Sequence, residues 1–170
     1  MRKRPAAVLA ILVGALLAIG SLAYWRFGQA IADPDAATLP DSLAGLRLVS
    51  AVYGPEAVAE VNHLHRKEFT LTSGAMGVYG SGAQATLWVT GAPLDVMAAQ
   101  MVTAMRDKIA EGNSPFLPLG ERQVGQRTIY ELGGMGQRHF YFQSSSLVVW
   151  LAANPEVADQ ALRDALGVYP

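Results

Sequence analysis

Near its N-terminus the chain contains an uncharged stretch of 21 residues, from Pro5 to Trp25, that is rich in leucine, isoleucine, valine and alanine. A membrane-spanning helix needs about 20 apolar residues, because each residue adds about 1.5 Å and the hydrocarbon layer is about 30 Å thick. Tyr24, Trp25 and Arg26 close the stretch, and aromatic and cationic side chains of this kind favour the headgroup interface. The sequence therefore predicts a transmembrane anchor over residues 1–27.

The charges on the two sides of this stretch differ. Arg2, Lys3 and Arg4 precede it, whereas residues 33–170 carry 9 basic and 14 acidic side chains. Basic residues beside a span remain on the cytoplasmic side. We therefore expect a single-pass protein of the cell membrane with a cytoplasmic N-terminus and an extracytoplasmic domain, periplasmic or external. The acidic balance of the domain disfavours nucleic acid as a partner.

A cleaved secretory signal peptide is the alternative to a retained anchor. Small residues at the −3 and −1 positions of a cleavage site occur in residues 21–23 (Ser-Leu-Ala) and 30–32 (Ala-Ile-Ala). The apolar stretch is longer than the roughly 7–15 residues typical of a signal peptide, which favours retention. Both outcomes place the domain outside the cytoplasm.

Small residues recur every four positions within the apolar stretch. Ala6, Ala10, Gly14 and Ala18 fall on one face of a helix. Such a face lets a second helix approach closely, which is how membrane helices associate. It predicts other membrane protein subunits or a second copy of the chain as partners, although alanine is also simply common in apolar segments.

The chain beyond the anchor divides into a linker and one domain. Residues 28–45 contain two prolines and three aspartates without a clear hydrophobic period, which predicts an extended linker. Residues 46–170 are enough for a single hydrophobic core. The chain has no cysteine, and this excludes disulfide frameworks, cysteine–zinc sites, iron–sulfur clusters, thiol nucleophiles and a lipoprotein anchor.

The hydrophobic pattern over residues 46–170 predicts an α+β domain with an antiparallel sheet and three helices. Alternation with a period of two marks the strands, and glycine or proline marks their ends. The first helix begins near residue 54, and its Val58, Val61 and Leu64 should face the core. The other two helices begin near residues 92 and 155. The predicted strands cover residues 46–52, 69–79, 85–90, 122–124, 127–132, 137–143 and 147–152.

Two parts of this pattern resemble each other. Trp88 and Pro93 recur as Trp150 and Pro155, 62 residues later in both cases, each time in a strand followed by a helix. The recurrence predicts two ββα units that share one sheet. The alternative is that the strand–proline–helix order occurs twice by chance.

The penultimate predicted strand is aromatic. Phe140 and Phe142 share one of its faces, which we expect in the core, and His139 and Tyr141 then face outward. An outward aromatic face with a histidine could bind a ligand or a protein partner, and ordinary cross-strand pairing is the alternative. The candidate face consists of Trp88, His139, Tyr141 and Trp150.

Other motifs indicate structure rather than chemistry. His63 and His65 lie two residues apart on a predicted helix, so their side chains diverge and cannot hold one metal ion unless the helix ends before His63. The glycines within residues 133–136 precede a predicted strand, and no lysine lies near them in the sequence. This pattern predicts a turn instead of a phosphate site. The sequence contains no Gly-x-Ser-x-Gly or His-Glu-x-x-His motif. We therefore expect no catalytic site, no metal and no cofactor.

Two stretches, residues 112–116 (Gly-Asn-Ser-Pro-Phe) and 134–142 (Gly-Met-Gly-Gln-Arg-His-Phe-Tyr-Phe), resemble small bacterial proteins that have one N-terminal membrane segment and no assigned function. The resemblance covers most of residues 46–166 and implies architecture alone. We expect a membrane-tethered interaction module that serves as an accessory or structural subunit of a membrane protein complex. An extracytoplasmic ligand-binding or enzymatic domain around His139 and Tyr141 is the alternative.

Overall fold

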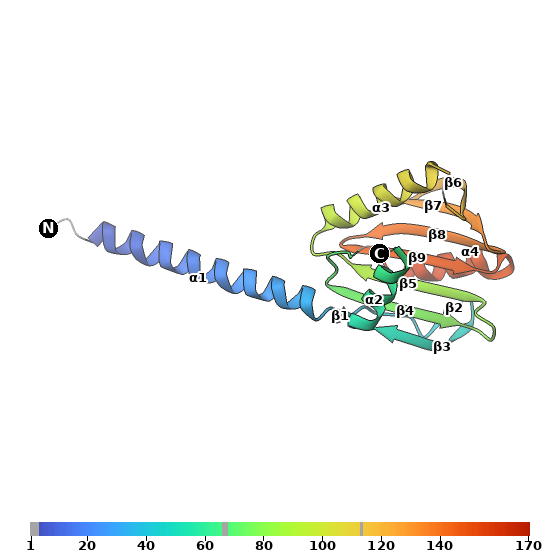
Figure 1. The fold of residues 1–170 in the computed structure, drawn as a ribbon, viewed down its shortest axis with the longest axis horizontal. Coiled ribbons are helices and arrows are strands. Elements are labelled where there is room, and N and C mark those ends of the chain that lie inside the picture. The colour runs from blue at the N-terminus through green and yellow to red at the C-terminus, as the bar shows by residue number, and fades with distance from the viewer. Residues whose placement is uncertain (1–3, 66–67, 113) are drawn as a thin grey trace.

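The computed structural model describes residues 4–65, 68–112 and 114–170 (Figure 1). Within these residues there are four helices and one sheet of nine strands, so the predicted α+β class with an antiparallel sheet is confirmed. The helices are α1 (Arg4–Ala32), α2 (Gly54–His65), α3 (Asp95–Ala110) and α4 (Pro155–Val168). The strands are β1 (Asp35–Ala36), β2 (Ser42–Leu43), β3 (Leu46–Tyr53), β4 (Ser73–Tyr79), β5 (Ala85–Gly91), β6 (Leu117–Val124), β7 (Arg127–Gly134), β8 (Gln137–Ser144) and β9 (Leu147–Ala153).

The sheet runs in the order β2-β3-β4-β5-β9-β8-β7-β6, and neighbours in this order are antiparallel. β1 adds a short parallel pairing to β4. Tight turns join the strands of the second half. Gly125 has φ 63° in the β6–β7 turn, and Met135 and Gly136 have φ 51° and 76° in the β7–β8 turn. Two consecutive positive φ values, as at Met135 and Gly136, match a type I′ hairpin, and a positive φ at the first turn residue alone, as at Gly125, matches type II′. The turns predicted at these two places are confirmed.

The two faces of the sheet are covered by different helices. Successive residues of a strand point to opposite faces, so Phe140 and Phe142 of β8 pack with α4 whereas Tyr141 packs with α3. We name these surfaces the α4 face and the α3 face. α2 lies over β4 on the α3 face, where a Cβ on Gly74 would touch Val58. Phe140 and Phe142 are buried as predicted.

The recurring tryptophans lie opposite each other at the centre of the sheet. β5 and β9 are neighbours, and their register pairs Trp88 with Trp150. The β4–β5–α3 and β8–β9–α4 units share the sheet, but α3 and α4 cover opposite faces. The internal repeat stays a prediction.

Residues 28–45 differ from the predicted extended linker. α1 continues to Ala32, and β1 and β2 pair with the sheet. Leu43 is buried in the core of the α4 face. Tyr79 and Tyr169 donate from their hydroxyls to backbone carbonyls of this segment, at 2.9 and 2.7 Å. Strand pairing, a few buried apolar side chains and these two hydrogen bonds hold the segment on the domain, and none of them follows from its composition.

The prediction for the first domain helix is partly wrong. Val58 and Val61 are buried, but Leu64 is exposed. His63 and His65 are exposed as well, so the last three side chains of α2 all lie outside the core. Periodicity assigns Leu64 to the correct side of the helix, yet the packing surface ends before that turn.

Candidate functional site

α1 projects from one end of the domain as an isolated helix (Figure 1). Its segment Ala7–Ala32 is long and apolar enough to cross a membrane, a property that a signal sequence shares. The large apolar side chains between Val8 and Leu22 are 48–71% exposed. Exposure of so much apolar surface to water is unfavourable. α1 is therefore a candidate membrane span.

The small-residue face of α1 has no neighbour within the described part of the chain. Ala10, Gly14 and Ala18 are exposed, and a Cβ built on Gly14 would meet nothing within 4 Å. Tyr24 and Trp25 are exposed near the other end of the helix. The side chain of Ala6 lies outside the described part of the structure, as do the basic residues Arg2 and Lys3.

The connection between α1 and the sheet is short. Asp33 and Pro34 alone separate the end of α1 from β1. Pro34 is buried, and the backbone N–H of Asp35 donates to the carbonyl of Thr72 at 2.9 Å. The domain is thus attached directly to the helix, without the 18-residue tether that the sequence predicted over residues 28–45.

The structure brings the predicted aromatic residues together on the α3 face. Tyr141 and Trp150 are cross-strand partners and their rings stack, with centroids 5.3 Å apart. Tyr130 stacks on the other side of Tyr141 at 4.8 Å. The indole N–H of Trp150 donates to Nδ1 of His139 at 3.3 Å. Trp88 lies across from Trp150 in the next strand.

The prediction that His139 and Tyr141 face outward is wrong. Their side chains are 2% and 1% exposed. The Phe116 ring lies over His139 and Trp150, with centroid distances of 4.7 and 5.2 Å, and residues of α3 pack in the same cluster as Tyr141. A sheet with helices on both faces buries both sides of its central strands. Aromatic residues on both faces of this strand are compatible with burial on both sides, but they do not by themselves show that a helix covers the second face.

Both ring nitrogens of His139 are engaged inside the protein. Nδ1 accepts from Trp150, so Nε2 carries the proton and donates to the carbonyl of Gly134 at 3.1 Å. Burial lowers the pKa of His139, and the hydrogen bond to Gly134 offsets this only in part. The imidazole is therefore neutral, and a second proton would replace the bond from Trp150. Burial also raises the pKa of the Tyr141 hydroxyl to about 12.

The indole of Trp88 is directed into the packing below α2. It contacts the cluster of Val58, Val61 and Leu71. Its Nε1 is buried and has no hydrogen-bond partner among the described residues. The four members of the candidate face therefore contribute to the core of the α3 side.

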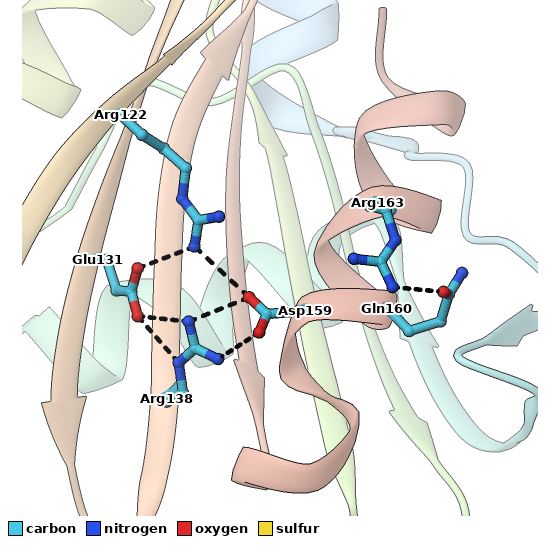
Figure 2. A network of polar contacts seen from close by, with 6 residues as sticks. All are labelled: Arg122, Glu131, Arg138, Asp159, Gln160 and Arg163. Atoms are coloured by element: carbon cyan, nitrogen blue, oxygen red, sulfur yellow. Dashed lines mark hydrogen bonds and ion pairs between the residues drawn. The ribbon is translucent and has the colours of Figure 1, made fainter.

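Four charged side chains form a network on the α4 face that sequence reasoning missed (Figure 2). Arg138 bonds Glu131 at 2.6 Å and Asp159 at 2.9 Å. Arg122 bonds Glu131 at 2.8 Å and lies 3.6 Å from Asp159. The hydrogen bond from Arg138 lowers the pKa of the Asp159 carboxyl. The two cations balance the two anions. Because the four residues come from different elements, their ion pairs connect α4 to β6, β7 and β8.

No signal in the sequence pointed to these four residues. Glu131 and Arg138 meet because β7 and β8 pair in one particular register, and Asp159 reaches them from a helix that follows in the chain. The guanidinium carbon of Arg138 also lies 5.2 Å from the centroid of Phe140. The network lies beside the buried Phe140, and its two arginines and two carboxylates pair with one another, so none of the four charges is left unpaired for a ligand.

The histidine pair of α2 does not approach a further ligand. Within the ranges that the structure describes, no group of three or more His, Asp or Glu side chains could hold a metal ion. His63 and His65 both lie within α2, which does not end before His63. Nδ1 of His65 lies 2.8 Å from the carbonyl oxygen of Val61, one turn earlier.

Comparison with the models of known protein families, with curated proteins and with solved structures found no match. The resemblance to small membrane-anchored bacterial proteins stays a prediction. The fold and the exposed helix define an α+β domain that follows an N-terminal candidate membrane span.

Proposed function

We propose that the protein is a membrane-tethered interaction module. α1 crosses the cell membrane once from a cytoplasmic N-terminus, and the domain lies at the extracytoplasmic surface as an accessory or structural subunit of a membrane protein complex. The observation that carries the proposal is the exposure of α1: among the described residues, its large apolar side chains from Val8 to Phe27 are 45–81% exposed. In a bilayer, that surface is covered by lipid and its backbone bonds are internal.

Association within the membrane uses the small-residue face of α1. Ala10, Gly14 and Ala18 are exposed on it, and a Cβ on Gly14 would meet no atom of the described residues within 4 Å. A partner helix, from another subunit or a second copy, gains contact area there because no large side chain holds it away. His139 and Tyr141 offer little support for the alternative ligand site, since both are buried.

The topology is tested with a reporter fused after Pro170. We expect activity in the extracytoplasmic compartment alone, together with retention of the chain in the membrane fraction after carbonate washing. Activity in the cytoplasm would reverse the orientation. A mature protein that begins after residue 23 or 32 and leaves the membrane would identify α1 as a signal peptide.

The association is tested with Gly14→Leu in the full chain. We expect self-association in a bilayer, or co-purification with partners, to weaken by about 1–2 kcal/mol, because a leucine separates the helices. Gly20→Leu is the matched control, since Gly20 also has open space around it but lies off the face. Equal behaviour of the two variants would contradict the role of this face.

A further inference from the structure

One end of the sheet meets α1, and several turns gather there. β4 begins at this end with Ser73, which pairs with Asp35 of β1. The antiparallel register places Gly91 opposite Ser73, and Leu147 opposite Gly91. The connection from β5 to α3 and the start of β9 therefore lie at this end, which we name the α1 end. Figure 1 shows α3 starting there and running away from it.

Two exposed apolar side chains mark the α1 end. Leu94 and Val96 are 58% and 57% exposed. Leu94 is the N-cap residue of α3, and its side chain makes no capping hydrogen bond. Serine, threonine, aspartate and asparagine stabilise a helix at this position, whereas leucine does not. Local helix stability therefore does not explain an exposed leucine there.

A shallow depression of about 330 Å³ opens at the same end of the sheet, beside the start of β9. It is lined largely by apolar side chains from the β1 segment, from the start of β9 and from the end of α4. The residues are Ala36, Ala37, Thr38, Ser73, Leu147, Val168 and Tyr169. The α1 end thus carries more apolar surface than the two exposed side chains alone.

The length of α1 determines how far this end lies from the hydrocarbon. Ala7–Ala32 comprises 26 residues, which extend about 39 Å at 1.5 Å per residue. The hydrocarbon takes about 30 Å of this length, and each headgroup region adds about 5–7 Å. If Ala7 lies at the inner edge of the hydrocarbon, Ala32 lies at the outer limit of the headgroups. The sheet begins three residues later, so the α1 end is within contact distance of the lipid.

We propose that the α1 end of the domain rests on the surface of the bilayer that α1 spans, with Leu94 and Val96 in the headgroup region. This inference rests on the proposed function, because it requires α1 to be in the membrane. Asp33, Asp35 and Asp95 are exposed at the same end. Carboxylates are repelled by anionic lipid, so the surface is suited to zwitterionic headgroups.

The absence of cysteine allows a direct test by site-specific labelling. Three full-length variants, Leu94→Cys, Leu17→Cys and Met135→Cys, are labelled with an environment-sensitive fluorophore and reconstituted into phosphatidylcholine vesicles that contain a nitroxide-labelled phosphatidylcholine. Met135 is the matched control, since it is exposed in the β7–β8 turn at the opposite end of the sheet. We expect loss of most of the fluorescence at positions 17 and 94 and no loss at 135.

The outcomes separate the inference from the proposed function. Quenching at 17 without quenching at 94 would overturn the inference and leave the anchor in place. No quenching at 17 would show that α1 is not in the bilayer and would refute both. A fluorescence change at 94 that requires a high ratio of protein to lipid would identify a second copy as the occupant and would also overturn the inference.

A second variant tests the apolar contact itself. This variant combines Leu94→Asp with a fluorophore on Val96→Cys. Because position 94 is exposed, the added charge should leave the fold intact, and circular dichroism checks this. We expect the label at 96 to lose its quenching relative to the same label beside the native leucine. Undiminished quenching would contradict insertion of this turn.

Discussion

Acid should destabilise the domain through His139, whose imidazole is neutral and buried in the folded protein. Burial lowers the pKa of His139 in the folded state, whereas a histidine in an unfolded chain has a pKa of about 6.5. Below about pH 6.5 the unfolded chain therefore takes up a proton that the folded chain does not. The contribution of His139 to stability is complete above that pH and decreases as the pH falls toward the folded-state pKa.

The magnitude has an upper bound. One proton bound only by the unfolded chain lowers the free energy of unfolding by about 1.4 kcal/mol per pH unit. Between about pH 6.5 and pH 5 the loss from this single group is therefore at most about 2 kcal/mol. Domains of ordinary size are stable by about 5–15 kcal/mol, so the loss is measurable while the protein remains folded.

The assay is urea unfolding of the full chain in detergent micelles, followed by tryptophan fluorescence from about pH 7.5 to about pH 5. His139→Phe removes the titrating group and leaves the N–H of Trp150 and the carbonyl of Gly134 unpaired. It should lower stability by about 1–3 kcal/mol at neutral pH and flatten the pH dependence. His65→Gln is the control for the removal of a histidine, because His65 is exposed. Identical slopes in the native protein and His139→Phe would refute the reasoning.

The remaining predictions concern packing and are measured by the same unfolding assay at neutral pH. Phe140→Ala should cost about 3–5 kcal/mol, because its ring is buried under α4, and a loss below about 1 kcal/mol would contradict that packing. Glu131→Gln should cost about 1–2 kcal/mol by weakening both arginine bonds, and an unchanged midpoint would show that the network is dispensable. Gly74→Ala should cost about 1–3 kcal/mol, since its Cβ would lie 2.9 Å from Val58 Cγ2 and 3.2 Å from the backbone nitrogen of Val58. Gly133→Ala, whose Cβ meets ordinary contacts at 3.5 Å or more, is its control, and equal losses would refute close packing of α2.

Several elements follow from short-range rules and were predictable. The alternation of Ala85, Leu87 and Val89 with more polar neighbours gives a strand in which these three side chains are buried. Gly125 and Gly136 allow the positive φ values that their hairpin turns require. The apolar helix is predictable as well, because its length and lack of charge distinguish it from the rest of the chain.

Residues 28–45 show where composition misleads. Two prolines and three aspartates predict a loose tether, yet Leu43 is buried and two tyrosine hydroxyls bond the carbonyls of this segment. Tyr79 and Tyr169 are distant in the sequence from the groups that they bind. The same holds for the charged network, since Asp159 meets Arg138 only because α4 packs on the sheet.

The sequence by itself determined the apolar helix, the strand periodicity and the turns, because each depends on neighbouring residues and on backbone geometry. Only the tertiary structure decided that His139 and Tyr141 are buried, since a strand with two aromatic faces does not reveal whether a second helix covers it. The tertiary structure also decided that α1 joins the sheet through two residues, which depends on the pairing of β1 with β4. Pairings of this kind join residues far apart in the chain, and their free energy comes from burial and register that no local pattern contains.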